Sequence, residues 1–131
     1  MKWLQVKTPM RTCLLDITSD LRKALKELGI QNGALQVFVP HTTAGITINE
    51  KADPDVPSDI LGRLEALVPS DAAYRHMEGN SDAHIKTLLT GSSVLVPVKD
   101  GSLVLGTWQA VFFAEYDGPR DRKVSVNPLG R

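Results

Sequence analysis

The segment from Trp108 to Tyr116 places the strongest constraint on the fold, because apolar side chains occupy both of its faces. Side chains of a β-strand alternate between the two faces of a sheet. One face of this segment carries five apolar side chains, namely Trp108, Ala110, Phe112, Ala114 and Tyr116. The other face carries Gln109, Val111, Phe113 and Glu115. The pattern predicts a central strand that is buried on both sides, in which Gln109 and Glu115 need partners. For Glu115 we favour pairing with an arginine over a role in function.

The rest of the chain alternates between helices and strands in an order typical of an α+β domain. Apolar residues at helical spacing predict helices near residues 20–28, 59–68 and 83–89, the last two capped by Ser58 and Ser81. Strands are predicted near residues 3–7, 11–18, 34–39, 45–49, 93–98, 102–105, 108–116 and 122–126. We expect a single domain over residues 1–131, with about seven strands and two to three helices, and with the C-terminal strands joined as a meander.

Composition excludes several classes of partner. Fifteen basic and fifteen acidic residues cancel, so the overall charge does not predict binding to nucleic acid or to an anionic membrane. Any anion site must therefore be local. The single cysteine, Cys13, fits a reducing compartment. The N-terminus lacks the apolar core of a signal peptide, and no apolar run approaches the ~20 residues that span a bilayer. We expect a cytoplasmic protein.

The histidines are the first candidates for chemistry. The chain has three, and two of them, His76 and His84, flank a short polar run that contains Asn80. The third, His41, follows Pro40 at the end of an apolar run. Three neutral imidazoles that leave a fourth position open are a recurrent catalytic zinc arrangement. The spacing matches no standard motif, so two interpretations stay open at this point: a shared metal, or three separate solvated or hydrogen-bonded histidines.

Other polar residues could contact a substrate or move a proton. Glu50 ends an apolar strand and Asp53 follows in an acidic loop, so either carboxylate could act as a general base. Arg120 and Arg122 follow a Gly-Pro turn, where forked guanidinium groups suit a phosphate or a carboxylate. Ser92, after a helix, could help to hold the same anion.

Five motifs together resemble one known family. They are His41-Thr-Thr-Ala-Gly-Ile-Thr-Ile-Asn-Glu50, Tyr74-x-His76, Gly79-Asn-Ser-Asp-Ala-His-Ile-Lys86, Leu105-Gly-Thr-Trp-Gln109 and Glu115-Tyr-Asp-Gly-Pro-Arg120. In this order and over nearly the whole chain, they resemble the YjbQ-like family (UPF0047), also called the secondary thiamine-phosphate synthase family. The resemblance implies a two-layer β-sandwich with helices, assembled as a homotrimer. It also implies a divalent metal, expected to be zinc, held by His41, His76 and His84.

The resemblance implies an enzyme with thiamine phosphate synthase activity, which joins a hydroxymethylpyrimidine diphosphate to a thiazole phosphate and releases diphosphate. We therefore expect a metal-dependent enzyme that acts on a small phosphorylated metabolite. Asn80, Ser92, Arg120 and Arg122 would contact this substrate, and Glu50 or Asp53 would transfer protons. Two alternatives stay open: a metal-dependent hydrolase of a small metabolite, and a non-catalytic module that binds a phosphorylated metabolite.

Overall fold

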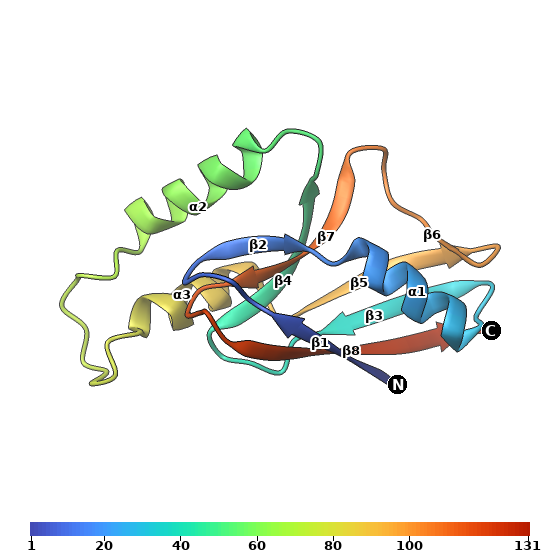
Figure 1. Ribbon diagram of the computed structural model, residues 1–131, viewed down its shortest axis with the longest axis horizontal. Helices are drawn as coiled ribbons and strands as arrows, with labels where there is room; N and C mark the ends of the chain where they lie inside the picture. The colour runs from blue at the N-terminus through green and yellow to red at the C-terminus, as the bar shows by residue number, and fades with distance from the viewer.

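Two antiparallel sheets form the frame of the molecule (Figure 1). The computed structural model describes residues 1–131. The five-stranded sheet has the order β1 (Lys2–Lys7), β8 (Asp121–Gly130), β3 (Gly33–Phe38), β5 (Ser93–Lys99) and β6 (Ser102–Leu103). The three-stranded sheet has the order β2 (Cys13–Asp16), β7 (Gln109–Glu115) and β4 (Ala44–Glu50). Three helices complete the fold: α1 (Thr18–Leu28), α2 (Asp55–Leu67) and α3 (Ser81–Thr90).

Strand β7 occupies the centre of the three-stranded sheet, as its two apolar faces predict. Val111 and Phe113 belong to a core cluster of 17 buried residues that also draws on the five-stranded sheet and α1. Ala114 and Tyr116 instead pack with Ala83 of α3 and with side chains of α2. The expected burial of Trp108 is wrong, because this residue lies in the turn before β7 and is 61% exposed. Each face of β7 is thus covered by a different layer.

The α+β class is confirmed, and the eight strands fall on the eight segments predicted as strands, one more than the rounded total of about seven. The predicted C-terminal meander is wrong. β5 and β6 form a hairpin in the larger sheet, but the chain then crosses to the smaller sheet for β7 and returns to the larger sheet for β8, between β1 and β3. The reason is the pattern of β7, because a strand with two apolar faces must lie between two covering layers.

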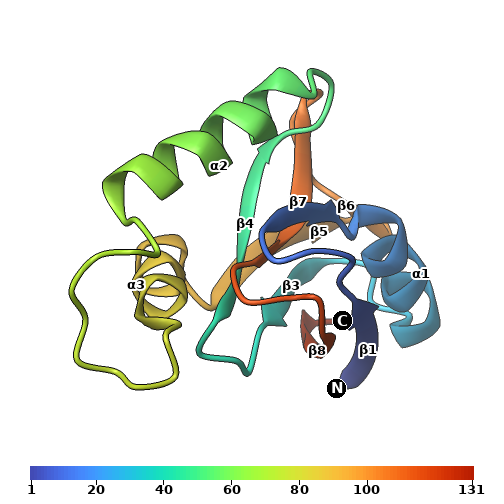
Figure 2. The same ribbon diagram turned by 60° about the vertical axis from the view of Figure 1, so that its left-hand side comes forward.

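The helices cover different parts of the sheets (Figure 2). α1 buries Leu21, Ala24 and Leu25 in the main core. α2 begins at Asp55, so the expected cap residue Ser58 lies inside the helix. Pro57 is tolerated there because the first helical turn needs no N–H donor. None of the three helices has both the length and the apolar character that crossing a bilayer would require.

Helix α3 approaches β4 closely at Gly45. A Cβ atom at this position would lie 2.5 Å from the carbonyl oxygen of Gly91, at the end of α3, and 3.2 Å from the side chain of Thr90. Only glycine accepts so close a backbone contact. The position of α3 relative to the smaller sheet is therefore set by the absence of a side chain at residue 45.

A buried ion pair joins the two sheets. Glu115, at the end of β7, and Arg122, on β8, have side chains that are 0% and 5% exposed. Arg122 Nε donates to Glu115 Oε1 at 2.8 Å and Nη2 donates to Oε2. Glu115 also accepts from the Thr8 hydroxyl at 2.7 Å and from the Asp117 N–H at 3.0 Å, while Arg122 Nη2 donates to Thr43 Oγ1 at 2.8 Å. The expected arginine partner of Glu115 is confirmed.

Burial alone would raise the pKa of Glu115, but the hydrogen bonds from Arg122, Asp117 and Thr8 outweigh it and hold the pKa below its ordinary value. The carboxylate is therefore charged in the folded protein. A buried charge with this many donors is costly to disturb, because removing one partner leaves the other without compensation.

Replacing Arg122 by Met should lower the free energy of unfolding by about 3–5 kcal/mol, because Glu115 then stays buried without its counter-charge. The double variant Glu115→Leu/Arg122→Met should lose clearly less, since it removes both charges. Urea unfolding followed by circular dichroism measures both. Lys2→Met, which breaks the exposed pair with Glu27, is the control and should leave the midpoint nearly unchanged. An Arg122→Met protein as stable as the control would contradict this role.

Stability should also depend on pH through Glu115. A carboxyl group whose pKa is lowered by folding stabilises the protein above its unfolded value, 4.5, and that contribution is lost as pH falls from there through the folded pKa. The difference in unfolding free energy between the wild type and Glu115→Gln should therefore be constant near neutral pH and shrink below about 4.5. Urea titrations between pH 7 and pH 3 test this, and a difference that does not change with pH would contradict it.

Candidate functional site

Three connecting segments lie toward one end of the molecule (Figure 1). Residues of these segments line a polar hollow of about 450 Å³. The segments are the turn between β3 and β4, the segment before α3, and the turn between β7 and β8. None of the residues that line the hollow is hydrophobic: Pro40, His41, Thr42, Thr43, His76, Glu78, Asn80, His84, Asp117, Arg120 and Arg122. We call it the histidine hollow, because it gathers all three histidines of the chain.

The histidines come from different elements. His84 lies in the first turn of α3, which begins at Ser81 and has Asn80, not Ser81, as its N-cap residue. The ring of His76 meets that of His84 edge-on, with centroids 5.5 Å apart. His41 stands before β4, and its Nε2 accepts a hydrogen bond from the Lys123 N–H at 3.0 Å. The structure thus brings the three predicted residues to one hollow.

The three histidine side chains do not lie close enough together to form a metal site in this structure. No group of three or more His, Cys, Asp or Glu side chains lies close enough together to hold a metal ion. The donors nevertheless have the right chemistry, since imidazole nitrogens suit zinc. Burial, and then the charge of Arg122, lower the pKa of His41 and favour its neutral form. The acceptor nitrogen of that form, Nε2, bonds to the Lys123 N–H, so His41 would have to give up this bond or change tautomer to hold a metal. The three-histidine metal site stays a prediction.

His76 reaches the hollow on a segment that connects α2 to α3, and an ion network joins these two helices. Lys86 of α3 contacts both Glu65 of α2 and Asp82 of α3. The side chains of Lys86 and Asp82 are only 2% and 1% exposed, and Arg11 also binds Asp82 at 3.0 Å. The segment from 68 to 80 therefore runs between two helices that this ion network holds together.

Arg120 is held in a fixed orientation. Its Nε donates to the Asp117 carbonyl at 2.7 Å, and its Nη2 donates to Asp117 Oδ2 at 2.9 Å. Asn80 Nδ2 donates to the same Oδ2 at 2.8 Å. Nη1 of Arg120 has no hydrogen bond within the chain, and the side chain is about half exposed. This guanidinium is both oriented and available to an anion.

Arg122 lines the same hollow but has a different environment. Its Nε and Nη2 are already engaged by Glu115 and Thr43. Its charge is balanced by Glu115, so its first role is to join the two sheets. A contact between Arg122 and a phosphate stays a prediction.

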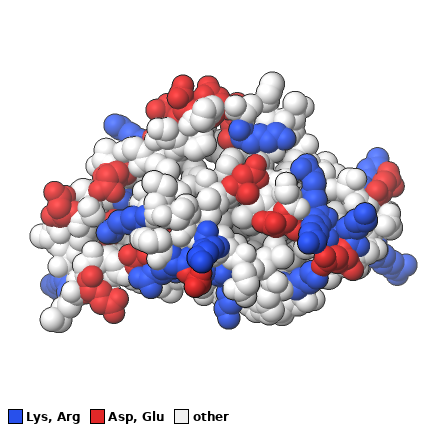
Figure 3. All heavy atoms as spheres, in the orientation of Figure 1, with Lys and Arg blue, Asp and Glu red and all other residues white.

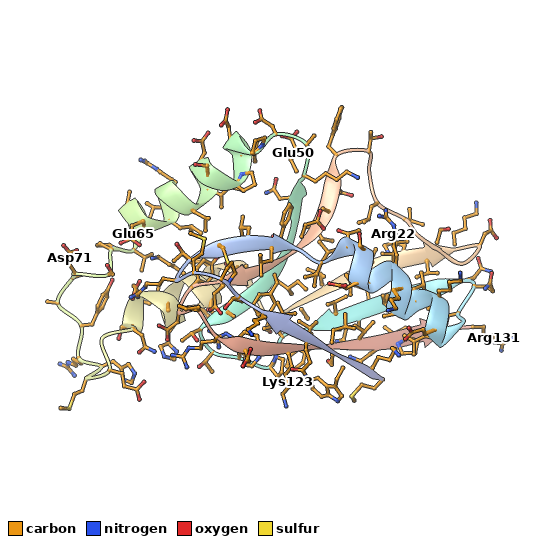
Figure 4. All side chains as sticks on the ribbon, viewed as in Figure 1. Arg22, Glu50, Glu65, Asp71, Lys123 and Arg131 are labelled. Atoms are coloured by element: carbon orange, nitrogen blue, oxygen red, sulfur yellow. The ribbon has the colours of Figure 1, made fainter.

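The structure does not bring Glu50 and Asp53 to the histidines within one chain. β4 starts beside the hollow and carries Glu50 to its far end, about 20 Å from Ala44 at ~3.3 Å per residue, and Figure 4 shows Glu50 at the start of the loop to α2, on the opposite side from Lys123. Asp53 Oδ1 accepts from the Asp55 N–H at 2.9 Å, at the start of α2. Neither residue lines the hollow.

Two other carboxylates lie there instead. Asp117 is held by Asn80 and Arg120, and Glu78 Oε2 lies 3.7 Å from His76 Nε2. Neither carboxylate was predicted from the sequence. A signal for Asp117 existed, because it stands three residues before Arg120 in a tight Gly-Pro turn.

Ser92 lies in a second hollow of about 350 Å³ beside the first. Its lining residues are His41, Thr42, His84, Thr87, Leu88, Gly91 and Ser92, so His41, Thr42 and His84 belong to both hollows. The predicted contact residues therefore divide between the two: Asn80, Arg120 and Arg122 in the histidine hollow, and Ser92 in the second hollow.

Lysine and arginine side chains are interspersed with acidic ones over the visible face of the molecule (Figure 3). No extended region of a single sign of charge stands out there. This agrees with a net charge of zero.

The chain thus combines a two-sheet α+β fold with three histidines at one end. The chain matches the family described as "UPF0047 protein YjbQ-like" over residues 2–131, and it is a member of that family. It is 51% identical to UPF0047 protein MJ1081 of Methanocaldococcus jannaschii over 126 residues, which cover 96% of this chain and 91% of the relative. It is 48% identical to UPF0047 protein YugU of Bacillus subtilis over 131 residues, covering 99% of each.

Solved structures agree with this assignment. A crystal structure of an uncharacterized conserved YjbQ/UPF0047 family protein from Clostridium acetobutylicum superposes with a TM-score of 0.96 at 50% identity, covering 98% of this chain and 100% of that chain. The conserved hypothetical protein TT1486 of Thermus thermophilus superposes with a TM-score of 0.92 at 47% identity, covering 98% and 100%. The family resemblance of the sequence is thereby confirmed.

Proposed function

We propose that the protein is a metal-dependent enzyme that acts on a small phosphorylated metabolite, with thiamine phosphate synthase as its reaction. One observation carries the proposal: a single hollow without hydrophobic lining gathers three histidines, Asn80 and an oriented Arg120. Neutral imidazoles and a guanidinium with a free amino group are the groups that a metal-assisted phosphate site requires. A volume of about 450 Å³ is within the range of small-molecule sites.

Each residue has a role in this proposal. His41, His76 and His84 would hold a divalent metal, expected to be zinc, and the bound metal would supply positive charge to a phosphate oxygen. Arg120 would bind the phosphate through Nη1, because Asp117 already fixes its other side. Glu78 and Asp117 replace Glu50 and Asp53 as the carboxylates available to move a proton, since only the former pair lines the hollow.

The second candidate is a non-catalytic module that binds a phosphorylated metabolite. It is favoured by the distance of Glu50 and Asp53 from the histidines, which leaves the hollow without the expected general base. Turnover separates the two candidates. Substoichiometric protein, incubated with zinc, the pyrimidine diphosphate and the thiazole phosphate, should release diphosphate and accumulate thiamine phosphate over many equivalents. Binding without turnover would favour the module, and release of inorganic phosphate alone would favour a hydrolase.

We further propose that the chain assembles as a homotrimer. Large apolar side chains are exposed on separate parts of the surface, among them Leu89 of α3, Leu95 of β5 and Trp108. A subunit contact would bury such residues.

Arg120→Lys should weaken phosphate binding by about 10- to 100-fold, the equivalent of one charge-assisted hydrogen bond of ~1.5–3 kcal/mol. Lysine keeps the charge but lacks the planar fork that bonds to Asp117 through two nitrogens and leaves the third, Nη1, for a ligand. Isothermal titration with inorganic phosphate measures the affinity, and the melting temperature should change little. Arg22→Lys on α1, outside the hollow (Figure 4), is the matched control. Equal affinity in the two variants would contradict the role of Arg120.

His84→Ala should lose most of the bound metal, because it removes one of three proposed ligands. Elemental analysis after dialysis against zinc gives the metal content per chain. Asp55→Ala, outside the hollow, should keep the full content. In the wild type, metal occupancy should fall as pH drops through about 6, near the unperturbed histidine value, because imidazole must be neutral to bind a metal. A full equivalent of zinc in His84→Ala would rule out the three-histidine site.

A further inference from the structure

A separate hollow of about 440 Å³ lies at the opposite end of the molecule from the histidine hollow (Figure 1). Its walls are α1, the turn that follows this helix, and the hairpin of β5 and β6. We call it the α1 hollow. Three charged and three apolar residues line it: Arg22, Lys26, Asp100, Leu25, Ile30 and Leu103. The α1 hollow shares no residue with the histidine hollow.

The charged side chains of the α1 hollow form no ion pair. Arg22 and Lys26 are four residues apart on α1, so they lie on the same face of the helix. Neither reaches a carboxylate, and Asp100 reaches no cationic side chain. In the histidine hollow, by contrast, Arg120 is already paired with Asp117. The α1 hollow therefore offers two positive groups and one negative group to a ligand, and no internal pair has to break.

The hairpin turn between β5 and β6 sets the position of Asp100. Asp100 and Gly101 have φ values of 50° and 75°, the left-handed conformations of a two-residue hairpin turn. The Asp100 N–H donates to Asn32 Oδ1 at 3.3 Å, and the Gly101 N–H donates to the Gln31 carbonyl at 2.9 Å. These two bonds hold the turn against the segment that follows α1. The place of the negative group in the α1 hollow is therefore fixed by the backbone.

The end of α1 provides a second attraction for a positive group. The helix ends at Leu28, and its C-cap residue Gly29 has a left-handed conformation and lines the α1 hollow. The carbonyl end of a helix carries a partial negative charge. A ligand ammonium group in the α1 hollow would therefore be attracted both by Asp100 and by the end of α1.

Core side chains provide the apolar part of the α1 hollow. Leu25 and Ile30 are only 2% and 7% exposed and belong to the main core cluster, and Leu103 packs against that cluster. A close-packed core keeps its shape, so this apolar surface is formed before any ligand arrives. A ligand that covers it with an apolar group gains free energy from the area removed from water.

We propose that the α1 hollow binds a free α-amino acid with an apolar side chain. The carboxylate binds Arg22 and Lys26, and the ammonium group binds Asp100. The side chain of the ligand covers Leu25 and Ile30. A volume of about 440 Å³ is within the range of small-molecule sites. This site is independent of the proposed function. Inorganic phosphate does not suit it, because the Asp100 carboxylate repels a dianion and phosphate has no apolar part.

Four small ligands of related shape test the proposal. L-leucine has all three parts, whereas 4-methylpentanoate lacks the ammonium group, 3-methylbutylamine lacks the carboxylate and glycine lacks the apolar side chain. Titration of the ¹⁵N-labelled full chain, followed by ¹H–¹⁵N NMR spectra, gives the affinity for each. We expect L-leucine to bind about 5-fold more tightly than each of the other three, the upper end for one solvent-exposed ion pair or one partly covered apolar group.

The same spectra give the location of the ligand. L-leucine should shift the backbone amide signals of Gly29, Gln31 and Gly101, which line the α1 hollow. The amide signals of Asn80 and Asp117, which line the histidine hollow, should stay in place. Shifts confined to the histidine hollow would overturn the proposal.

Two variants assign the charged contacts. Asp100→Asn preserves the turn, because asparagine also tolerates the left-handed conformation, and it should remove the advantage of L-leucine over 4-methylpentanoate. Asp71→Asn, at the opposite end of the molecule from Arg22 (Figure 4), is the control and should keep that advantage. Lys26→Met should weaken the binding of L-leucine but not that of 3-methylbutylamine. Its control is Lys51→Met, at an exposed position outside the α1 hollow.

Every other outcome counts against the proposal. If 4-methylpentanoate binds as tightly as L-leucine, the α1 hollow is a site for simple carboxylates, and Asp100 has no role in it. If Asp100→Asn and Asp71→Asn behave alike, the ammonium group binds elsewhere and the assignment is wrong. If L-leucine shifts none of the amide signals, the α1 hollow is not an amino-acid site. None of these results affects the proposed function, which depends on phosphate binding and turnover at the histidine hollow.

Discussion

The buried pair of Glu115 and Arg122 is the interaction on which the rest of the structure depends. It balances two charges at the place where the five-stranded and three-stranded sheets meet. The same two side chains also position the walls of the histidine hollow. Glu115 binds the N–H of Asp117, and Arg122 binds Thr43, while Thr8, which donates to Glu115, accepts the N–H of Arg120. The fold and the site therefore share one electrostatic centre, so a change there would alter both.

An element could be predicted from the sequence wherever its local pattern of apolar residues is compatible with only one kind of burial. The alternation in β7 requires burial on both faces, and the structure satisfies it with a sheet on one side and helices on the other. The order of the C-terminal strands could not be predicted in the same way. A meander and a crossover leave the same local pattern in β8, and only the demand of β7 for two covering layers, together with the pairing of β8 to β1 and β3, selects the crossover.

Some residues of the candidate site could likewise be predicted from the sequence, and others could not. Histidines at the ends of elements could be singled out, because polar residues beside apolar runs mark the rim of a core. The direction in which β4 carries Glu50 depends on pairing between distant strands, so no local pattern indicates that Glu50 leaves the hollow. Asp117 was missed for another reason. An aspartate in a turn is ordinary, and only its hydrogen bonds with Asn80 and Arg120 distinguish it.

Any ligand that needs both His76 and His84 depends on the length of the segment from 68 to 80. The contact between Glu65 and Lys86 fixes the two helices that the segment joins. The length of the segment then sets the effective concentration of His76 near His84. For a short flexible linker this concentration is on the order of millimolar. Lengthening such a loop costs the fold little, about 0.6 kcal/mol for each doubling, but it dilutes His76 around its neighbour. Loop length here is therefore nearly neutral for folding, but it sets how often the His76 ring lies beside His84.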